Sequence, residues 1–177
     1  MKPEAEWFEM IGKTIPKESM LAFLDQYPEL IQYTLDLSIR NHQPHSWRAA
    51  WLIKLKCKKN DPLVIPYLER MIAAIDGKQD GHQRELMKIV IKLPWNEDQE
   101  GILFDKCLVI CRSLSKSPSV RIVAFQILTK LILKYPELWH EIQFMVEEDY
   151  FESLSTGIKN GFKKDLDYLR KAVLPQL

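Results

Sequence analysis

A regular internal repeat constrains the fold of this chain more than any other feature. The sequence Tyr-Pro-Glu-Leu begins at Tyr27 and again at Tyr135, 108 residues later, which is three times 36. A second series of similar segments has nearly the same period, with intervals of 36, 37 and 38 residues. These segments align on Arg48, Arg84, Arg121 and Lys159. Two independent markers therefore predict an array of structural units of one length.

Each unit has the sequence pattern of two amphipathic helices. Apolar residues recur at intervals of three and four, and no stretch alternates between apolar and polar residues as a strand does. One such series is Val120, Val123, Ala124, Ile127, Leu128 and Leu131. Asp61 before Pro62 predicts a helix start with proline at the first helical position. Gly77 and Asn60 are typical of helix ends.

The expected fold is all-α, a superhelical solenoid of about four to five helical hairpins in one domain that spans residues 1–177. Residues 1–27 supply two capping helices, roughly 3–13 and 17–26. Residues 28–172 form four helix pairs: 28–40 with 46–59, 62–76 with 81–93, 98–115 with 118–134, and 136–149 with 154–172.

The sequence resembles a HEAT repeat. The resemblance rests on the Val-Arg-x-x-Ala pattern near the start of a second helix, at Val120 to Ala124. The segment RAAWLIKLKCKKNDPLVIPYLERM is similar to small Bacteroidetes HEAT-like proteins, some of which are labelled adenylosuccinate lyase. The serine-bearing loop motif of that lyase superfamily has no match in this chain, so we expect no lyase activity.

Charge is segregated between the two helices of the pairs, although the formal net charge is only +1. The predicted second helices sum to +13 and the first helices to −8. In a HEAT-like stack, second helices line the concave side. We therefore expect a basic trough that attracts an acidic segment of a protein partner. The predicted binding residues are Lys54, Lys58, Lys88, Lys92, Arg121, Lys130 and Lys163.

Two alternatives to this interpretation stay open. The same trough is a candidate nucleic-acid surface, whose binding would weaken steeply with salt. Arg48, Arg84 and Arg121 recur at equivalent positions, which favours a structural ladder paired with carboxylates of adjacent repeats. The lysines farther along these helices also fit a solvated face.

Aromatic residues offer further candidates for binding. Trp47 and Trp51 share a helix face and are interpreted as core residues, with an aromatic platform as the alternative. Trp95 lies in a loop between units, where it is either an interface anchor or a plug that folds back onto the helices.

No residue constellation predicts catalysis, a cofactor or a metal site. Cys107 and Cys111 fall on the apolar stripe of one helix and lack two further ligands, so a core position is favoured. His42 and His45 are interpreted as loop and helix-start residues. The sequence has no phosphate-binding glycine loop, no Ser–His–Asp arrangement and no paired carboxylates in an acid/base context.

Composition and cysteine content bear on the compartment. The chain has no apolar run near the ~20 residues of a membrane span, and its N-terminal segment lacks the apolar core of a signal peptide. Three cysteines form no disulfide-like pattern, which favours a reducing compartment. We expect a cytoplasmic protein with a protein partner, of undetermined oligomeric state.

Overall fold

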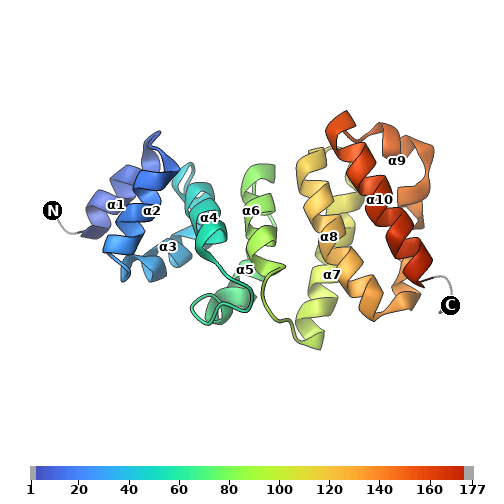
Figure 1. Ribbon diagram of the computed structural model, residues 1–177, viewed down its shortest axis with the longest axis horizontal. Coiled ribbons are helices and arrows are strands. Elements are labelled where there is room, and N and C mark those ends of the chain that lie inside the picture. Colours follow the sequence, from blue (N-terminus) through green and yellow to red (C-terminus); the bar gives the residue numbers. More distant parts are fainter. Residues whose placement is uncertain (1–2, 174–177) are drawn as a thin grey trace. The chain divides into compact units, whose positions relative to one another are not determined.

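The computed structural model describes residues 3–173, and these residues form helices and turns but no strand (Figure 1). The predicted all-α class and the helical-repeat architecture are confirmed. The chain divides into two compact units, Met1–Trp95 and Asn96–Leu177. We describe each unit by itself, and the single domain expected from the sequence stays a prediction.

The first unit consists of the capping helices and two helix pairs. Its elements are α1 (Pro3–Gly12), α2 (Lys17–Gln26), α3 (Leu30–Ile39), α4 (His45–Lys56), the 3-10 helix η1 (Ile65–Tyr67), α5 (Leu68–Ala73) and α6 (Asp80–Val90). The two predicted second helices, α4 and α6, pack against each other, and α4 also packs against α3 (Figure 1). This is the neighbour-on-neighbour packing expected of helical repeats.

The second unit contains the remaining two pairs. Its elements are α7 (Glu97–Arg112), α8 (Pro118–Lys134), the 3-10 helix η2 (Pro136–Val146), α9 (Glu148–Glu152) and α10 (Thr156–Val173). The second helices α8 and α10 pack against each other, and α7 packs against α8. The first helix expected at 136–149 is thus a 3-10 helix followed by the short α9.

The helix expected to start at Pro62 starts later in the structure, so this prediction is wrong. The side chain of Asp61 accepts hydrogen bonds from the backbone N–H of Lys58 and of Leu63, both at 3.1 Å. Residues 62–64 form a turn, and helical structure begins only at Ile65. The cause is Pro66, because a proline in a helix clashes with the carbonyl four residues earlier and disfavours α geometry just before it.

Gly77 and Asn60, expected at helix ends, lie in the turns after α5 and α4, since these helices end earlier, at Ala73 and Lys56. Gly77 and Asn60 have positive φ values of 68° and 54°, the left-handed conformation that glycine and asparagine adopt most readily. The start of α7 has a capping box, in which Asn96 and Gln99 exchange side-chain to backbone hydrogen bonds.

The core of the first unit begins with the capping helices. Trp7 is fully buried, and its indole N–H donates to the Thr34 hydroxyl at 2.8 Å. That hydroxyl in turn donates to the Leu30 carbonyl at 2.7 Å, so the polar atoms introduced by Trp7 and Thr34 are paired. The surrounding core includes Ile11, Met20, Leu24, Leu37, Ala49 and Leu52.

The core of the second unit is aromatic where α8 meets α10. The rings of Phe125 and Phe162 lie 4.5 Å apart, and Tyr150 of α9 packs on Phe162. Cys107 and Cys111 are fully buried on the inner face of α7, as expected for core cysteines. None of the helices between residues 3 and 173 is both long enough and apolar enough to cross a bilayer.

Candidate functional site

Two of the predicted binding residues support the fold instead of a ligand. The ammonium group of Lys92 donates to the carbonyls of Lys54 and Cys57, at 2.7 and 2.8 Å, where α4 ends. Arg121 is 1% exposed and donates to the hydroxyl and the carbonyl of Ser153, at 2.8 and 2.7 Å. Cations at the last carbonyls of a helix satisfy groups that the helix leaves unpaired. The assignment of Arg121 to a binding surface is wrong because the side chain is buried, and Lys92 is committed to α4.

Basic side chains bind the last carbonyls of two further helices in the first unit. Arg48 donates to two carbonyls at the end of α1, and Lys78 donates to two at the end of α3. Like Lys92, each reaches back by 35 to 39 residues, which is close to the repeat length. Arg48 and Arg121 are therefore structural, but their partners are carbonyls and a hydroxyl rather than the expected carboxylates.

Three other cations of the second helices converge on one buried carboxylate. Glu85 is 2% exposed; its oxygens lie 3.4 Å from the Lys54 ammonium, 3.0 Å from the Arg84 guanidinium and 3.7 Å from the Lys88 ammonium. We call Lys54, Arg84, Glu85 and Lys88 the Glu85 cluster. Because three cations surround one carboxylate, the cluster carries a net charge of +2, and its cationic side chains are 21% to 37% exposed.

The two tryptophans of α4 lie on the helix face that continues from this cluster. Trp51 precedes Lys54 by three residues and Trp47 precedes Trp51 by four, so neighbouring side chains of this series share one face. Both indoles are half-buried: Trp51 packs against the core, and the Arg48 guanidinium lies over Trp47 at 5.7 Å. Each tryptophan thus contributes to the fold and still presents part of its ring.

The remaining predicted lysines are exposed. Lys58 lies in the loop after α4 rather than on the helix, Lys130 lies on α8, and Lys163 lies on α10. On α8 a nearby basic residue is engaged within the second unit, because Lys134 donates to both carboxylate oxygens of Glu100 at 2.9 and 2.8 Å. The structure therefore leaves Lys58, Lys130 and Lys163 as surface residues, whose binding role stays a prediction.

Trp95 folds back onto its own unit. Its indole N–H donates to the carbonyl of Val90, the last residue of α6, at 2.9 Å, and the ring is half-buried. This contact supports the plug interpretation over that of an interface anchor.

Histidine and cysteine side chains serve the cores. His82 is 1% exposed; its Nε2 lies 2.7 Å from the Ser38 carbonyl and its Nδ1 lies 2.9 Å from the Gln43 amide nitrogen. A carbonyl only accepts, so Nε2 carries the proton and Nδ1 accepts. Burial lowers the pKa of His82 and raises that of Cys111 to about 12. Within residues 3–173 no three His, Cys, Asp or Glu side chains gather as metal ligands do.

The histidine pair of the loop before α4 packs with the capping helix α1. His45 begins α4, and its ring stacks on Phe8 at 4.1 Å, while His42 lies edge-on to both rings. Gly12 lets this ring approach closely, since a Cβ at that position would lie 2.6 Å from the His45 ring and would force it to shift. These contacts agree with the loop and helix-start interpretation of the two histidines.

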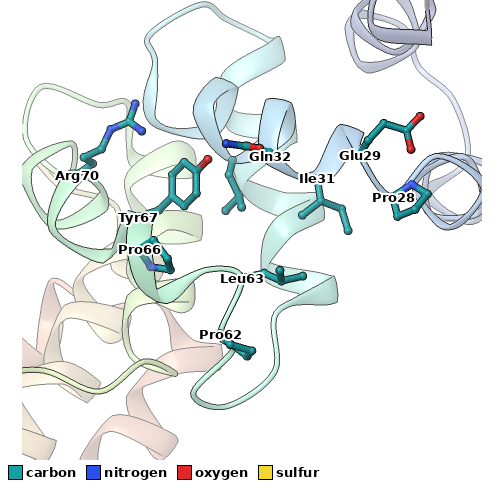
Figure 2. Close-up of a pocket in the computed structure, with 10 residues that line it drawn as sticks. Pro28, Glu29, Ile31, Gln32, Pro62, Leu63, Pro66, Tyr67 and Arg70 are labelled. Atoms are coloured by element: carbon teal, nitrogen blue, oxygen red, sulfur yellow. The ribbon is translucent and has the colours of Figure 1, made fainter.

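A groove that the sequence did not predict lies between two first helices of the first unit (Figure 2). Its volume is about 510 Å³, and α3 forms one wall while residues 62–70 form the other. Leu63 is 61% exposed beside it. The sequence signal for this groove was a bulky apolar residue between Pro62 and Pro66. It was not recognised because residues 62–76 were expected to form a helix.

Comparison with known proteins identifies the family. A model of the HEAT repeat domain matches residues 16–167. No curated protein and no solved structure matches the chain significantly. The matched range covers most of the chain, from just before α2 into α10, in agreement with the resemblance in the Val-Arg-x-x-Ala pattern. The chain belongs to the HEAT repeat family.

Proposed function

We propose that this protein is a non-catalytic, cytoplasmic scaffold that binds an acidic segment of another protein on its second-helix surface. HEAT repeats generally serve as protein-interaction scaffolds and are typically not enzymes. In the first unit the proposed surface is the Glu85 cluster together with Trp47 and Trp51. Lys130 and Lys163 are the proposed contacts on the second helices of the second unit.

The Glu85 cluster is the observation that supports this proposal most. Glu85 is almost completely buried, and it holds the cationic groups of Lys54, Arg84 and Lys88 within 3.7 Å of its oxygens. Cations held in place by a buried partner lose less conformational freedom on binding than free surface lysines do. The cluster therefore presents a net charge of +2 to an incoming carboxylate, beside two partly exposed indoles.

The proposal of a cytoplasmic location rests on the cysteines. Cys57, Cys107 and Cys111 are all free thiols, and all three are buried. Free, unpaired cysteines are usual in proteins of reducing compartments.

Binding of a fluorescein-labelled, glutamate-rich peptide, followed by fluorescence anisotropy, tests the acidic-segment proposal. The double substitution Arg84→Gln with Lys88→Gln removes two cations, and we expect it to weaken binding about tenfold. Glu85→Gln keeps the side-chain shape and raises the net charge of the cluster, so we expect it to tighten binding. A general loss of structure would weaken binding in both variants, so weaker binding in one and tighter binding in the other identifies an effect of charge.

The matched control is Lys13→Gln with Lys17→Gln. It removes two exposed lysines, one just after α1 and one at the start of α2, which pair with the neighbouring exposed Glu9 and Glu18. Its affinity for the peptide should equal that of the unmodified chain. Equal affinities for the cluster variants and the control, with far-UV circular dichroism unchanged, would refute the assignment to the Glu85 cluster.

Nucleic acid is the second candidate ligand, and the half-exposed Trp47 and Trp51 beside Lys54 favour it. Bases stack on such indoles, and the cations contact phosphates. A labelled single-stranded oligonucleotide in the same assay distinguishes the two ligands. Binding of the oligonucleotide without binding of the peptide, with an affinity that falls steeply with salt, would replace the acidic-segment proposal.

A further inference from the structure

An exposed apolar surface surrounds Leu63 on the first-helix side of the first unit. Leu63 is 61% exposed, whereas its neighbour Val64 is buried at 3%. Figure 2 shows Leu63 and Ile31 on facing walls of the groove, with Pro62 on the loop that carries Leu63 and Pro66 in η1 just after it. A bulky apolar side chain held in water beside a groove is a common feature of protein-binding sites.

The wall that carries Leu63 is fixed before any ligand arrives. Pro62 and Pro66 restrict the backbone on both sides of Leu63, and the Asp61 carboxylate accepts from the backbone N–H of Leu63 and of Lys58. The chain next to the groove is therefore held in one conformation by covalent restriction and by hydrogen bonds. Preorganisation of this kind lowers the entropy lost when a segment docks.

Two lysines lie where this groove continues along the loop. A neighbouring cavity of about 500 Å³ shares Ile31, Pro62 and Leu63 with the first and is lined also by Lys58 and Lys59. Both lysines are exposed, and within residues 3–173 neither side chain forms an ion pair. The Asp61 carboxylate lines the same cavity but accepts from backbone N–H groups rather than from either ammonium, so the apolar surface is bordered by two cations and one anion.

Two other cations near the groove are already paired with carboxylates. Lys56 forms an ion pair with Asp25, and Arg70 forms one with Asp36 at 2.8 Å. Glu29 also lines the first cavity, and the Asp61 carboxylate lies next to Leu63 in the second. Lys58 and Lys59 outnumber Asp61, so the second cavity, next to Leu63, is net positive.

We propose that this groove, which we call the Leu63 groove, binds a peptide segment of a partner protein that carries a bulky apolar side chain next to carboxylates. The apolar side chain lies against Leu63 and Ile31, and the carboxylates meet Lys58 and Lys59. The residues of this surface differ from those of the Glu85 cluster, since α3, the end of α4 and the 57–70 segment form it. It gives the scaffold a second point of attachment.

A second copy of this chain fits the groove less well. In a two-fold symmetric pair the same patch meets itself, so Lys58 and Lys59 of one copy would approach those of the other. Like charges across an interface oppose association. Charge complementarity therefore points to an acidic partner.

The test is the binding of a labelled peptide with a central Leu-Phe pair flanked by glutamates, measured by fluorescence anisotropy. Leu63→Ser should weaken binding about tenfold, because it removes most of the apolar contact. Lys58→Gln with Lys59→Gln should also weaken binding, and the effect should shrink as salt is raised. Peptides with alanine for the Leu-Phe pair, or with lysine for the glutamates, should bind far more weakly.

Val109→Ser is the matched control, because Val109 is 68% exposed on α7 and lies in the other unit. It should bind the Leu-Phe peptide like the unmodified chain. Arg84→Gln with Lys88→Gln should leave unchanged the ratio of the affinities for the Leu-Phe peptide and for its alanine counterpart, so failure of the Glu85 proposal leaves this test intact. Equal affinities of Leu63→Ser and Val109→Ser would overturn the proposal. So would a concentration-dependent dimer that Leu63→Ser abolishes in light scattering, since it would identify a second copy as the occupant.

Discussion

Replacement of Lys92 by methionine separates a structural cation from a binding one. The Lys92 ammonium is shared between two carbonyls at the end of α4, at 2.7 and 2.8 Å. Lys92→Met keeps the length and the apolar stem of the side chain but removes both hydrogen bonds. The two carbonyls then lose a charged donor at the negative end of a helix.

The size of the effect follows from these two contacts. A hydrogen bond to a charged group contributes about 1.5 to 3 kcal/mol, and the site is only partly buried, so hydration of the ammonium in the unfolded chain offsets part of the gain. We therefore expect a loss of about 2 kcal/mol in the free energy of unfolding of the first unit. For a unit of this size that corresponds to a fall in Tm of about 10 °C.

Urea unfolding followed by far-UV circular dichroism measures this loss, with Lys58→Met as the control. Lys58 is exposed, and its ammonium has no ion-pair partner within residues 3–173, so its replacement should change the free energy of unfolding by less than about 0.5 kcal/mol. Lys92→Arg should recover part of the stability, since a guanidinium also reaches two carbonyls. Equal unfolding midpoints for Lys92→Met and Lys58→Met would refute the capping role of Lys92.

Two further predictions follow from buried titratable groups. Burial lowers the pKa of His82 below its ordinary value of 6.5, so the folded chain binds fewer protons than the unfolded chain near that pH. The stability contributed by neutral His82 is complete above pH 6.5 and is lost as pH falls below it. His82→Gln keeps a donor toward the Ser38 carbonyl but does not titrate. Its Tm should therefore fall less between about pH 7.5 and 5.5 than that of the unmodified chain. An unchanged pH slope in this variant would contradict the assignment. Burial also raises the pKa of Cys111 to about 12 and raises that of Cys107, so both thiols should react with a disulfide reagent only as fast as the second unit opens. Peptide mapping by mass spectrometry after brief labelling checks this, and rapid native labelling of either cysteine would contradict the buried positions.

The sequence by itself determined the helical repeats. A period near 36 residues and apolar residues at intervals of three and four specify paired helices, because only one stripe of each helix can leave water. Most predicted helices, such as that at 118–134, begin and end where the structure has them or within a few residues. The helix start at Pro62 failed because the effect of Pro66 on the residues before it outweighs the capping signal of Asp61.

Tertiary structure alone decided what each cation does. Lys54, Lys58, Lys88 and Lys92 look alike in sequence, but one is committed to the end of α4, two border a buried carboxylate and one is exposed. The spacing of Glu85 and Lys88 on α6 is visible in the sequence, but Lys54 reaches Glu85 from another helix and Lys92 binds backbone carbonyls, contacts that helix periodicity does not encode. For the same reason the Leu63 groove appears only when α3 and the 62–70 segment are brought together, since each wall comes from a different repeat.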